Sequence, residues 1–446
     1  MPEETSRPAA KSPRSLSGLL PFVRPYRGIV ALAGVFLVLA ALSTLAFPVA
    51  LKQLIDQGLV AAEPGQQLMA LRGHFLALFG VAAALGVFSA LRFFTVSWLG
   101  ERITADLRNA VYGHVLKQSP EFFESTRTGE VLSRLTTDTT LVQTVVGSSL
   151  SMGLRNVVMG AGALIALIVT NPWVMTQVLG LLVLVVLPSL YFGRRVRKLS
   201  RASQDRVADS SAIAAEVLNE IPVVQSHVQE GREAERFNRS TEEAFATARR
   251  RTTVRAVLVG FMITATFGAL LWGLYQGTQA VIDGRITAGH LGQTVVFVII
   301  FVGAVAVLSE IYGDLLRAAG ATERLMELLA STSPVAEPAR PVPLPPVGRG
   351  SSLALEGVTF HYPSRPKTPS LAEFSLSVCA GETVALVGPS GAGKSTVFQL
   401  LLRFYDAQQG RVRVDGVDVR EASLAALRGR IGLVPQDSTV FSTSAL

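Results

Sequence analysis

Long stretches without a single charged side chain set the strongest limit on how this 446-residue chain can fold. A helix needs about 20 apolar residues to cross the hydrocarbon core of a bilayer, and there each backbone group must be satisfied within its own segment. The uncharged runs are 28–51, 73–91, 156–193, 256–282 and 286–309. They predict a series of membrane-spanning helices.

The longest of these runs, 156–193, holds 38 residues and is too long for one span. Its Asn171-Pro172 dipeptide is a turn signal and predicts two helices joined by a tight hairpin. Six spans therefore result, within an all-α transmembrane domain of residues 28–330. We expect them at about 28–51, 74–99, 151–170, 172–193, 256–282 and 287–310.

The composition agrees with a membrane protein that carries a soluble part. Hydrophobic residues make up 49% of the chain and charged residues 17%, whereas soluble domains hold nearer ~25% charged residues. The mean hydropathy is +0.41. Cys379 is the one cysteine, which excludes a disulfide framework and a cysteine-based metal cluster.

The distribution of Lys and Arg predicts the orientation in the membrane. Segments 1–27, 101–155 and 194–255 carry 24 basic residues, and the connections on the opposite side carry 3. Under the positive-inside rule, the N-terminal segment 1–27, both long loops and the C-terminal region lie in the cytoplasm. With 35 Arg against 6 Lys, the sequence suggests a GC-rich bacterial genome and hence a cell inner (plasma) membrane.

The two long inner loops have helical periodicity, so we expect the spanning helices to continue tens of ångströms beyond the membrane. A pair of solvated helical hairpins without a partner is the alternative. After residue 330 the composition changes. Residues 331–350 hold six prolines and read as a semi-extended linker, and 351–446 begins as a β-rich region with apolar runs at 353–360, 374–378 and 383–387.

The strongest local signal is a phosphate-binding loop that matches G-x-x-x-x-G-K-[ST] in full. An apolar, β-branched run at 383–387 precedes it, and a helix-forming run at 396–404 follows, as the motif requires. The alternative is a Gly-rich turn with an incidental lysine. The residues expected to bind nucleotide here are Gly388, Pro389, Ser390, Gly391, Ala392, Gly393, Lys394, Ser395 and Thr396.

The chemistry of this loop follows from its residue types. Glycines let backbone N–H groups close around phosphate oxygens, and the N-terminus of the next helix adds partial positive charge. Lys394 is expected to reach the terminal phosphates, and the hydroxyl of Ser395 to join the shell of a Mg²⁺ ion. The motif alone does not separate an ATPase from a GTPase or a kinase.

Residues on either side of the loop help to distinguish among these three classes of nucleotide-binding protein. Tyr362 precedes the loop by about 25 residues and can lie flat against an adenine ring, although an aromatic that caps the core at a strand end is an equal alternative. Val412–Val414 followed by Asp415-Gly416 predicts a hairpin. Ile431–Val434 predicts a second buried strand that delivers Gln436 at its end.

With these motifs together, the chain resembles a half-size ATP-binding cassette exporter of the multidrug and lipid flippase type. The carriers of the resemblance are Tyr362, the phosphate loop, the RFYD segment with its hairpin, and the VPQD segment with Gln436. In the membrane half, 122–138 and 220–226 resemble the two intracellular loops whose coupling helices dock on the cassettes.

The resemblance implies a fold and an activity. The fold is a six-helix transmembrane domain followed by an incomplete α/β P-loop domain, and the activity is ATP-driven export or flipping of a hydrophobic or amphipathic substrate. ATP and Mg²⁺ are the implied cofactors, with Ser395 and Gln436 as metal ligands. The implied partners are membrane lipid, a drug, lipid or peptide substrate, and a second half-transporter in a homodimer or heterodimer.

One departure from the family pattern is large. The region from Leu353 to the last residue does not contain the Leu-Ser-Gly-Gly-Gln signature, the Walker B acidic pair or the switch histidine. The resemblance therefore implies that the catalytic base is missing from these 446 residues and that no catalytic set is complete, with Lys394 and Gln436 as its remaining members. A fragment, from a clipped gene model, a frameshift or a split gene, is the expected explanation.

Three functions compete at this point. The first is an exporter half, and the second is a hydrolysis-incompetent, membrane-anchored nucleotide-binding fragment. The third is a basic membrane protein that engages nucleic acid. We expect no nucleic-acid partner, because the basic residues fall where membrane topology already requires them.

Overall fold

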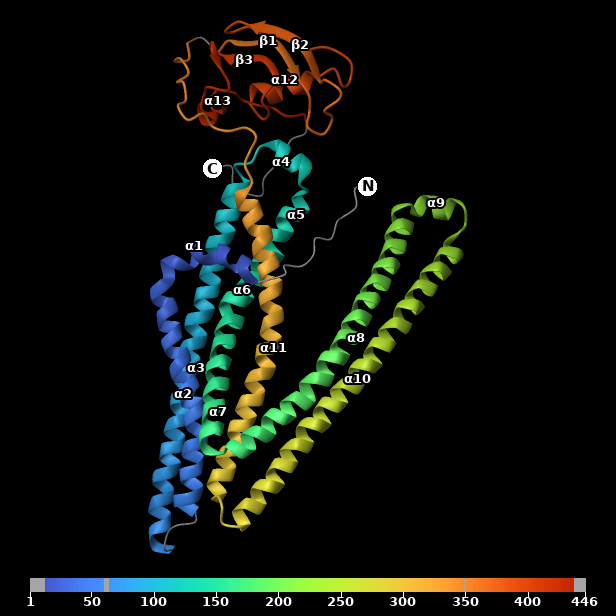
Figure 1. Ribbon diagram of the computed structural model, residues 1–446. Helices are drawn as coiled ribbons and strands as arrows, with labels where there is room; N and C mark the ends of the chain where they lie inside the picture. Colours follow the sequence, from blue (N-terminus) through green and yellow to red (C-terminus); the bar gives the residue numbers. More distant parts are fainter. Residues whose placement is uncertain (1–12, 60–63, 349, 437–446) are drawn as a thin grey trace. The chain divides into compact units, whose positions relative to one another are not determined.

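The structure is a computed structural model that describes residues 13–59, 64–348 and 350–436. Within these residues the chain is helical up to Ala330, and every strand comes after residue 350 (Figure 1). The long helices are α2 (Arg27–Gln53), α3 (Pro64–Val115), α7 (Leu150–Thr170), α8 (Pro172–Asn219), α10 (Glu230–Ile282) and α11 (Ala288–Ala330).

Short helical segments connect the long helices. Around α2 lie η1 (Pro13–Leu19), α1 (Leu20–Val23), η2 (Arg24–Tyr26) and η3 (Leu54–Leu59). Between α3 and α7 lie α4 (Pro120–Ser125), α5 (Thr128–Ser133), η4 (Arg134–Asp138), α6 (Thr139–Thr144) and η5 (Val145–Ser149). One further short helix, α9 (Ile221–Ser226), joins α8 to α10.

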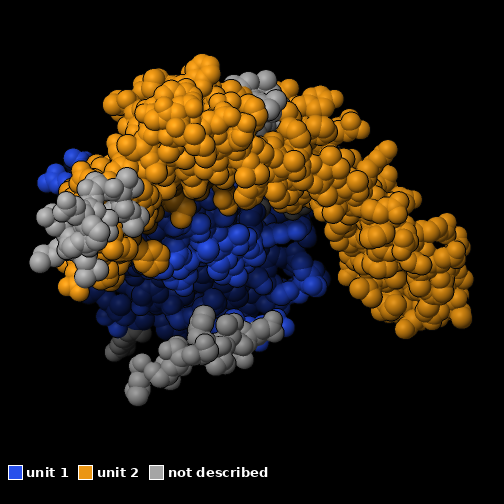
Figure 2. All heavy atoms as spheres, turned by 90° about the horizontal axis from the view of Figure 1, so that it is seen from below, with its two compact units in different colours: residues 1–30, 96–150, 312–446 blue, residues 31–95, 151–311 orange. Residues whose placement is uncertain are grey.

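The chain divides into two compact units, which are coloured separately in Figure 2. Unit 1 consists of residues 1–30, 96–150 and 312–446, and unit 2 of residues 31–95 and 151–311. Each unit is thus assembled from segments that are distant in the sequence.

Most of the expected membrane spans fall on helices that could cross a membrane. In the described part of the chain, five helical stretches are long and apolar enough to cross a membrane: 15–57, 71–115, 128–170, 230–282 and 288–330. The expected fourth span, 172–193, lies in α8, where most side chains from 178 to 190 fall outside the description. The domain boundaries themselves remain predictions.

The expected turn and the expected helix extensions are both present. Helix α7 ends at Thr170 and α8 begins at Pro172, so the hairpin lies at the Asn171-Pro172 turn signal. Helix α10 holds 53 residues, which corresponds to ~80 Å at 1.5 Å per residue. That length is far more than a bilayer needs, so α10 continues well beyond the membrane as predicted.

Unit 2 is held by close helix packing and one polar anchor. Its core cluster consists of Ala163, Leu167, Phe297 and Phe301 from α7 and α11. At the start of α11, the carboxylate of Asp56 accepts hydrogen bonds from the Gly289 amide at 2.9 Å and the Thr287 hydroxyl at 2.7 Å. This carboxylate caps the positive N-terminal end of α11 and fixes where the helix begins.

The helical part of unit 1 contains a buried cluster and an ion pair whose carboxylate is buried. Leu107, Val111, Val142 and Leu325 pack together with less than 1% exposure each. Next to them, Arg324 of α11 donates to both oxygens of Asp138, at 2.9 and 2.5 Å, and the Asp138 side chain is only 7% exposed. Such a bidentate pair fixes α11 against the η4 segment.

The C-terminal part of unit 1 is built on a four-stranded antiparallel sheet. Its order is β2-β1-β3-β4, from β1 (Leu353–Phe360), β2 (Leu371–Val378), β3 (Gln409–Val414) and β4 (Val417–Asp418). The β3–β4 hairpin is confirmed, with Asp415 and Gly416 at φ +51° and +79° as a type I′ turn requires. Helices α12 (Lys394–Leu401) and α13 (Leu424–Arg428) complete this part, and Leu400 and Leu427 join its buried core.

Two expected strands are wrong. The segments 383–387 and 431–434 form neither helix nor strand and take part in no strand pair within residues 350–436. A strand at the centre of a parallel sheet exists only when neighbouring strands take up its backbone hydrogen bonds. Without such neighbours among the described residues, Val387 is 89% exposed and Val434 94% exposed.

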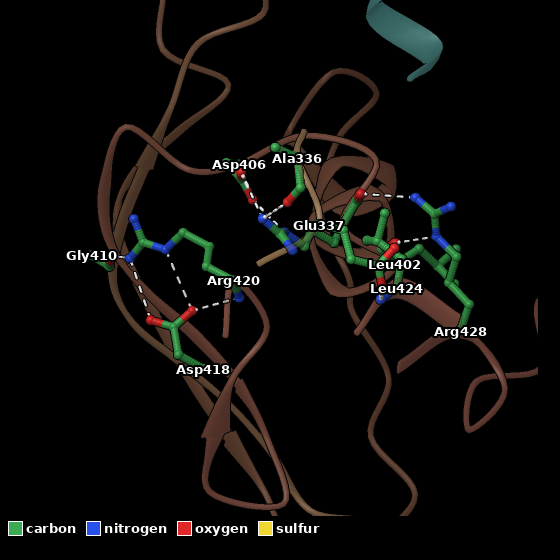
Figure 3. A network of polar contacts seen from close by, with 10 residues as sticks. Ala336, Glu337, Leu402, Asp406, Gly410, Asp418, Arg420, Leu424 and Arg428 are labelled. Carbon is green, nitrogen blue, oxygen red and sulfur yellow. Dashed lines mark hydrogen bonds and ion pairs between the residues drawn. The ribbon is translucent and has the colours of Figure 1, made fainter. Parts of the chain in front are cut away.

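The described part of the Pro-rich linker, 331–348, forms no helix or strand, and hydrogen bonds connect it to the sheet region. Its Ala336 carbonyl accepts from Arg403 at 3.0 Å, and its Glu337 carboxylate accepts from the Leu424 amide at the start of α13, also at 3.0 Å (Figure 3). Farther along, Val342 donates its amide to the Glu421 carbonyl at 2.8 Å. The linker is therefore held against the sheet region by hydrogen bonds.

Candidate functional site

The phosphate loop ends directly at the N-terminus of α12, with Gly393 as the N-cap. Gly391 and Gly393 have φ of +85° and +83°, a left-handed conformation that side chains other than glycine rarely adopt. At Gly393 a Cβ would lie 2.4 Å from the backbone oxygen of Ser370, so no side chain fits there. The loop conformation thus depends on these two glycines, as the motif implies.

The loop folds around its own lysine. Lys394 Nζ donates to the carbonyl oxygens of Gly388 and Pro389, at 2.8 Å each. Ser395 follows on the first turn of α12 and is exposed. The donor set suits phosphate and a hard cation, because it combines one ammonium group, a helix N-terminus and one accessible hydroxyl.

Tyr362 lies beside the loop helix. Its hydroxyl is 2.5 Å from Gln399 Oε1 and 3.1 Å from the buried Thr396 Oγ1, so the structure brings two of the expected site residues together. The ring meets Phe360 and Tyr405 edge-on, with centroids 4.9 and 5.4 Å apart. These contacts fit the core-capping alternative, and the stacking role of Tyr362 on adenine remains a prediction.

Gln436 is not brought to the loop. It is exposed, and within the described residues no hydrogen bond connects it to Lys394 or Ser395. The segment before it, 431–434, is the one that forms no strand pair, so nothing fixes the direction in which Gln436 points. The metal-binding role of Gln436 stays a prediction.

A contact that the sequence did not reveal joins the sheet region to the short helix α4, also within unit 1. Tyr405, which is 4% exposed, donates a short hydrogen bond from its hydroxyl to the carboxylate of Glu124 on α4. Burial and this carboxylate raise the pKa of Tyr405 well above its ordinary value. Both residues stand in motifs singled out above, but their pairing could not be read from either motif alone.

Unit 2 holds an apolar cavity of about 730 Å³ between α10 and α11. Phe267, Trp272 and Val298 contribute apolar surface, and Gln177 and Thr294 supply polar groups. The volume lies within the range of small-molecule sites, which are mostly apolar with a few fixed polar groups.

Comparison with known proteins decides the family. The family model described as "ABC transporter transmembrane region" matches residues 30–305, more than half of the chain. The chain belongs to the ABC transporter family. The model described as "ABC transporter" matches residues 371–446, so this ABC transporter chain joins a membrane domain to an ATP-binding domain, as its motifs indicated. ABC transporters are ATPases as a family, and nucleotide binding belongs to the second of these domains.

Three relatives illustrate the similarity. The chain is 32% identical to "ATP-binding cassette sub-family B member 10, mitochondrial" of Mus musculus, with 98% of this chain and 61% of the relative covered. It is 32% identical to "ABC multidrug transporter mdr2" of Aspergillus fumigatus, with 95% and 54% covered. It is 30% identical to "ATP-dependent permease MDL1, mitochondrial" of Schizosaccharomyces pombe, with 92% and 57% covered.

These comparisons confirm the resemblance to exporters and correct one prediction. The chain spans 54% to 61% of the length of these three relatives. The expected location in a bacterial plasma membrane is wrong, because two of the three relatives carry "mitochondrial" in their names. Residue counts such as Arg against Lys report codon composition, which does not determine the membrane in which a protein resides.

Proposed function

We propose that this ABC transporter chain is the membrane and nucleotide-binding part of an exporter that moves a hydrophobic or amphipathic molecule at the expense of ATP. The contact between Tyr405 and Glu124 carries this proposal. It joins the region of the phosphate loop to α4, which follows α3 in the sequence. Residues 71–115 of α3 form a stretch long and apolar enough to cross a membrane. Movement at the nucleotide site therefore has a direct mechanical route to that helix.

The nucleotide is ATP with Mg²⁺. Lys394 offsets the charge of the terminal phosphates, backbone amides at the start of α12 bind their oxygens, and the Ser395 hydroxyl is a ligand of the metal. A Mg²⁺ ion held there by Ser395 would supply positive charge against the phosphates. Tyr362 and Gln436 complete the proposed nucleotide-binding set, with Tyr362 against the base and Gln436 at the metal.

The substrate class follows from the cavity of unit 2. A space of about 730 Å³ lined mostly by apolar side chains takes a molecule of drug or lipid-chain size. Polar groups of the lining, Gln177 and Thr294 among them, would orient a headgroup or a heteroatom. Two copies of the chain, or one copy and a related half-transporter, would form the transport pathway, in the mitochondrial membrane that the relatives' names support.

A chimera tests this function. Residues 1–446 are fused to the part of the mouse relative that follows the matched region, and inverted membrane vesicles are assayed for ATP-dependent uptake of a lipophilic fluorescent dye. We expect uptake by the chimera and loss of uptake after Lys394→Ala. Uptake that is unchanged by Lys394→Ala would contradict the proposal.

A second function is supported for the 446-residue polypeptide alone: nucleotide binding without turnover. Two acidic residues that precede the phosphate loop in the sequence already have partners. Glu356 of β1 pairs with Arg413 at 3.3 Å, and Glu382 accepts from the Cys379 amide at 2.8 Å. Hydrolysis needs a group that positions the attacking water at the γ-phosphate, and we propose that neither carboxylate fills that role.

A further inference from the structure

The antiparallel pair of α8 and α10 has a register that its polar contacts define. Figure 1 shows the two helices side by side, with α9 at their common end. The hydroxyls of Ser210 and Ser240 are 2.8 Å apart, and Arg206 pairs with Glu243 at 3.1 Å. Each step toward the membrane along α8 is therefore matched by one step along α10. If this register continues along both helices, residues 194–201 lie opposite residues 248–255.

The charged residues of these two facing segments are all basic. We call the set the basic collar, and all but Arg251 are exposed. No acidic residue occurs at positions 172–204 or 244–282, which include both segments and the uncharged spans beside them. The basic collar consists of Arg194, Arg195, Arg197, Lys198 and Arg201 on α8, and of Arg249, Arg250, Arg251 and Arg255 on α10.

The charges of the basic collar are unpaired. Among the described residues, none of its nine side chains takes part in an ion pair. Farther from the membrane the same two helices carry charges of both signs, and there Arg236 bridges to Glu216 and Glu233 at 3.3 and 3.1 Å. The change from unpaired to paired charges occurs between positions 201 and 206.

Two other long helices, α3 and α11, do not repeat this pattern. Past its uncharged run, α3 carries Arg102 and Asp106 in an ion pair of 2.7 Å. In α11 the corresponding stretch carries Asp314 and Arg317, which also form an ion pair. A general bias toward basic inner loops thus explains why positive charge is present on α8 and α10, but not why it is concentrated there without ion pairs among the described residues.

Like charges that face each other across two packed helices repel, so the arrangement costs stability unless anions lie against it. The collar starts immediately after the uncharged spans and extends over about 8 residues, or ~12 Å of helix. That length is enough to cross one headgroup layer of about 5–8 Å, since a bilayer measures about 30 Å without its headgroups and about 40–45 Å with them. Tyr191, just before the collar, is 67% exposed, as interfacial aromatic residues are.

We propose that the basic collar binds the headgroups of anionic phospholipids in the membrane leaflet on the cassette side. Phosphate oxygens there supply the negative charge that the protein does not, and arginine presents several N–H donors to them. A nucleic acid is disfavoured as the occupant, because the collar lies at headgroup depth, directly beside apolar spans. The proposal does not depend on the transport function.

The test uses the full chain, purified in a non-ionic detergent, and fluorescent phosphatidylglycerol added to the micelles. We expect binding that unlabelled phosphatidylglycerol competes away and that phosphatidylcholine and inorganic phosphate do not. Binding should weaken as NaCl rises from 50 to 500 mM. The test variant neutralises four collar residues: Arg195→Gln, Lys198→Gln, Arg249→Gln and Arg250→Gln. Its affinity should fall at least about tenfold, because each basic residue near an anionic surface contributes about fivefold.

The matched control removes the same number of charges from the distal part of the same helix pair: Arg206→Gln, Arg232→Gln, Arg236→Gln and Arg239→Gln. It should change the affinity less than about twofold. If the collar variant does not elute as the wild type does, the pair Arg195→Gln and Arg250→Gln is measured instead. Equal losses in collar and control variants, or equal binding of phosphatidylcholine, would overturn the proposal. Preferential binding of a single-stranded RNA oligonucleotide that the collar substitutions abolish would overturn it too.

Discussion

The hydroxyl of Tyr405 in the cassette donates a hydrogen bond to the carboxylate of Glu124, which lies 281 positions earlier on α4. The pKa of Tyr405 is raised by burial and by this carboxylate, so the phenol stays protonated and remains a donor at every physiological pH. A single charge-assisted hydrogen bond thus joins α4 to the segment that follows α12 and the phosphate loop.

This bond is measurable by a double-mutant cycle. Tyr405→Phe and Glu124→Gln should each lower the stability of the chain in detergent, and their effects should not add. We expect a coupling free energy of about 1.5–3 kcal/mol, the usual range for a hydrogen bond to a charged group. Thermal unfolding of the two single variants and the double variant gives this quantity. Additive effects would show that the two side chains do not interact.

The ion pair between Arg324 and Asp138 predicts an asymmetric response to substitution. Arg324→Ala leaves a carboxylate that is 7% exposed without its partner, whereas Asp138→Asn removes the charge and keeps the shape. We expect Arg324→Ala to cost about 2 kcal/mol of stability and Asp138→Asn less than that. Unfolding midpoints in the same detergent test this order, and a larger loss for Asp138→Asn would contradict it.

Local signals and membrane physics made much of the fold predictable. Uncharged runs indicate spans because a charge inside hydrocarbon is costly, and Asn171-Pro172 and Asp415-Gly416 predicted turns that the structure contains. The phosphate loop was predictable because its motif is local. Its glycines and its lysine act within a few residues of one another, so the motif holds nearly all the information that the local geometry needs.

The features that the sequence did not reveal depend on distant partners. Segments 383–387 and 431–434 have strand-like composition, but a strand also requires neighbours that form hydrogen bonds with it. The Tyr405–Glu124 contact and the facing basic runs of α8 and α10 arise from tertiary register, which one sequence does not encode in any local pattern. Tertiary contacts are also needed to interpret Tyr362, because its aromatic side chain suits both stacking on a base and packing in the core.

The two left-handed glycines of the phosphate loop offer a matched comparison. Gly391→Ala meets no atom within 4 Å and should cost only the backbone penalty of about 1 kcal/mol. Gly393→Ala has the same penalty and in addition places Cβ 2.4 Å from the Ser370 oxygen. We therefore expect a larger loss of ATP affinity and of melting temperature for Gly393→Ala. Equal effects of the two substitutions would show that the loop relaxes freely around Ser370.

Asp415 predicts a pH dependence of stability. Burial alone would raise the pKa of Asp415, but hydrogen bonds from the Ser352 amide at 2.8 Å and from Arg430 at 2.5 Å hold it below its ordinary value. A carboxyl with a lowered pKa in the folded state stabilises the protein fully above its unfolded pKa of about 4. That contribution is lost as the pH falls through the lower, folded pKa.

The variant for this test is Asp415→Asn, because asparagine also adopts the left-handed conformation that this turn position requires. We expect the wild type to be more stable than the variant at pH 6, with a gap that narrows steadily below pH 4. Thermal unfolding across pH 3–6 measures the gap. A gap that stays constant over that range would mean that the carboxylate at 415 contributes no charge-dependent stability.

The last prediction concerns turnover by residues 1–446 alone. Lys394, Ser395 and the start of α12 can hold ATP and Mg²⁺, so we expect saturable binding of a fluorescent ATP analogue, weakened at least about tenfold by Lys394→Ala. Hydrolysis also needs a group that positions the attacking water, and Glu356 and Glu382 are bound to other partners. Magnesium-dependent phosphate release by the wild-type polypeptide should therefore equal that of the Lys394→Ala variant. Release well above the variant would reveal a catalytic group within these residues, and equally weak nucleotide binding by both proteins would refute the phosphate site itself.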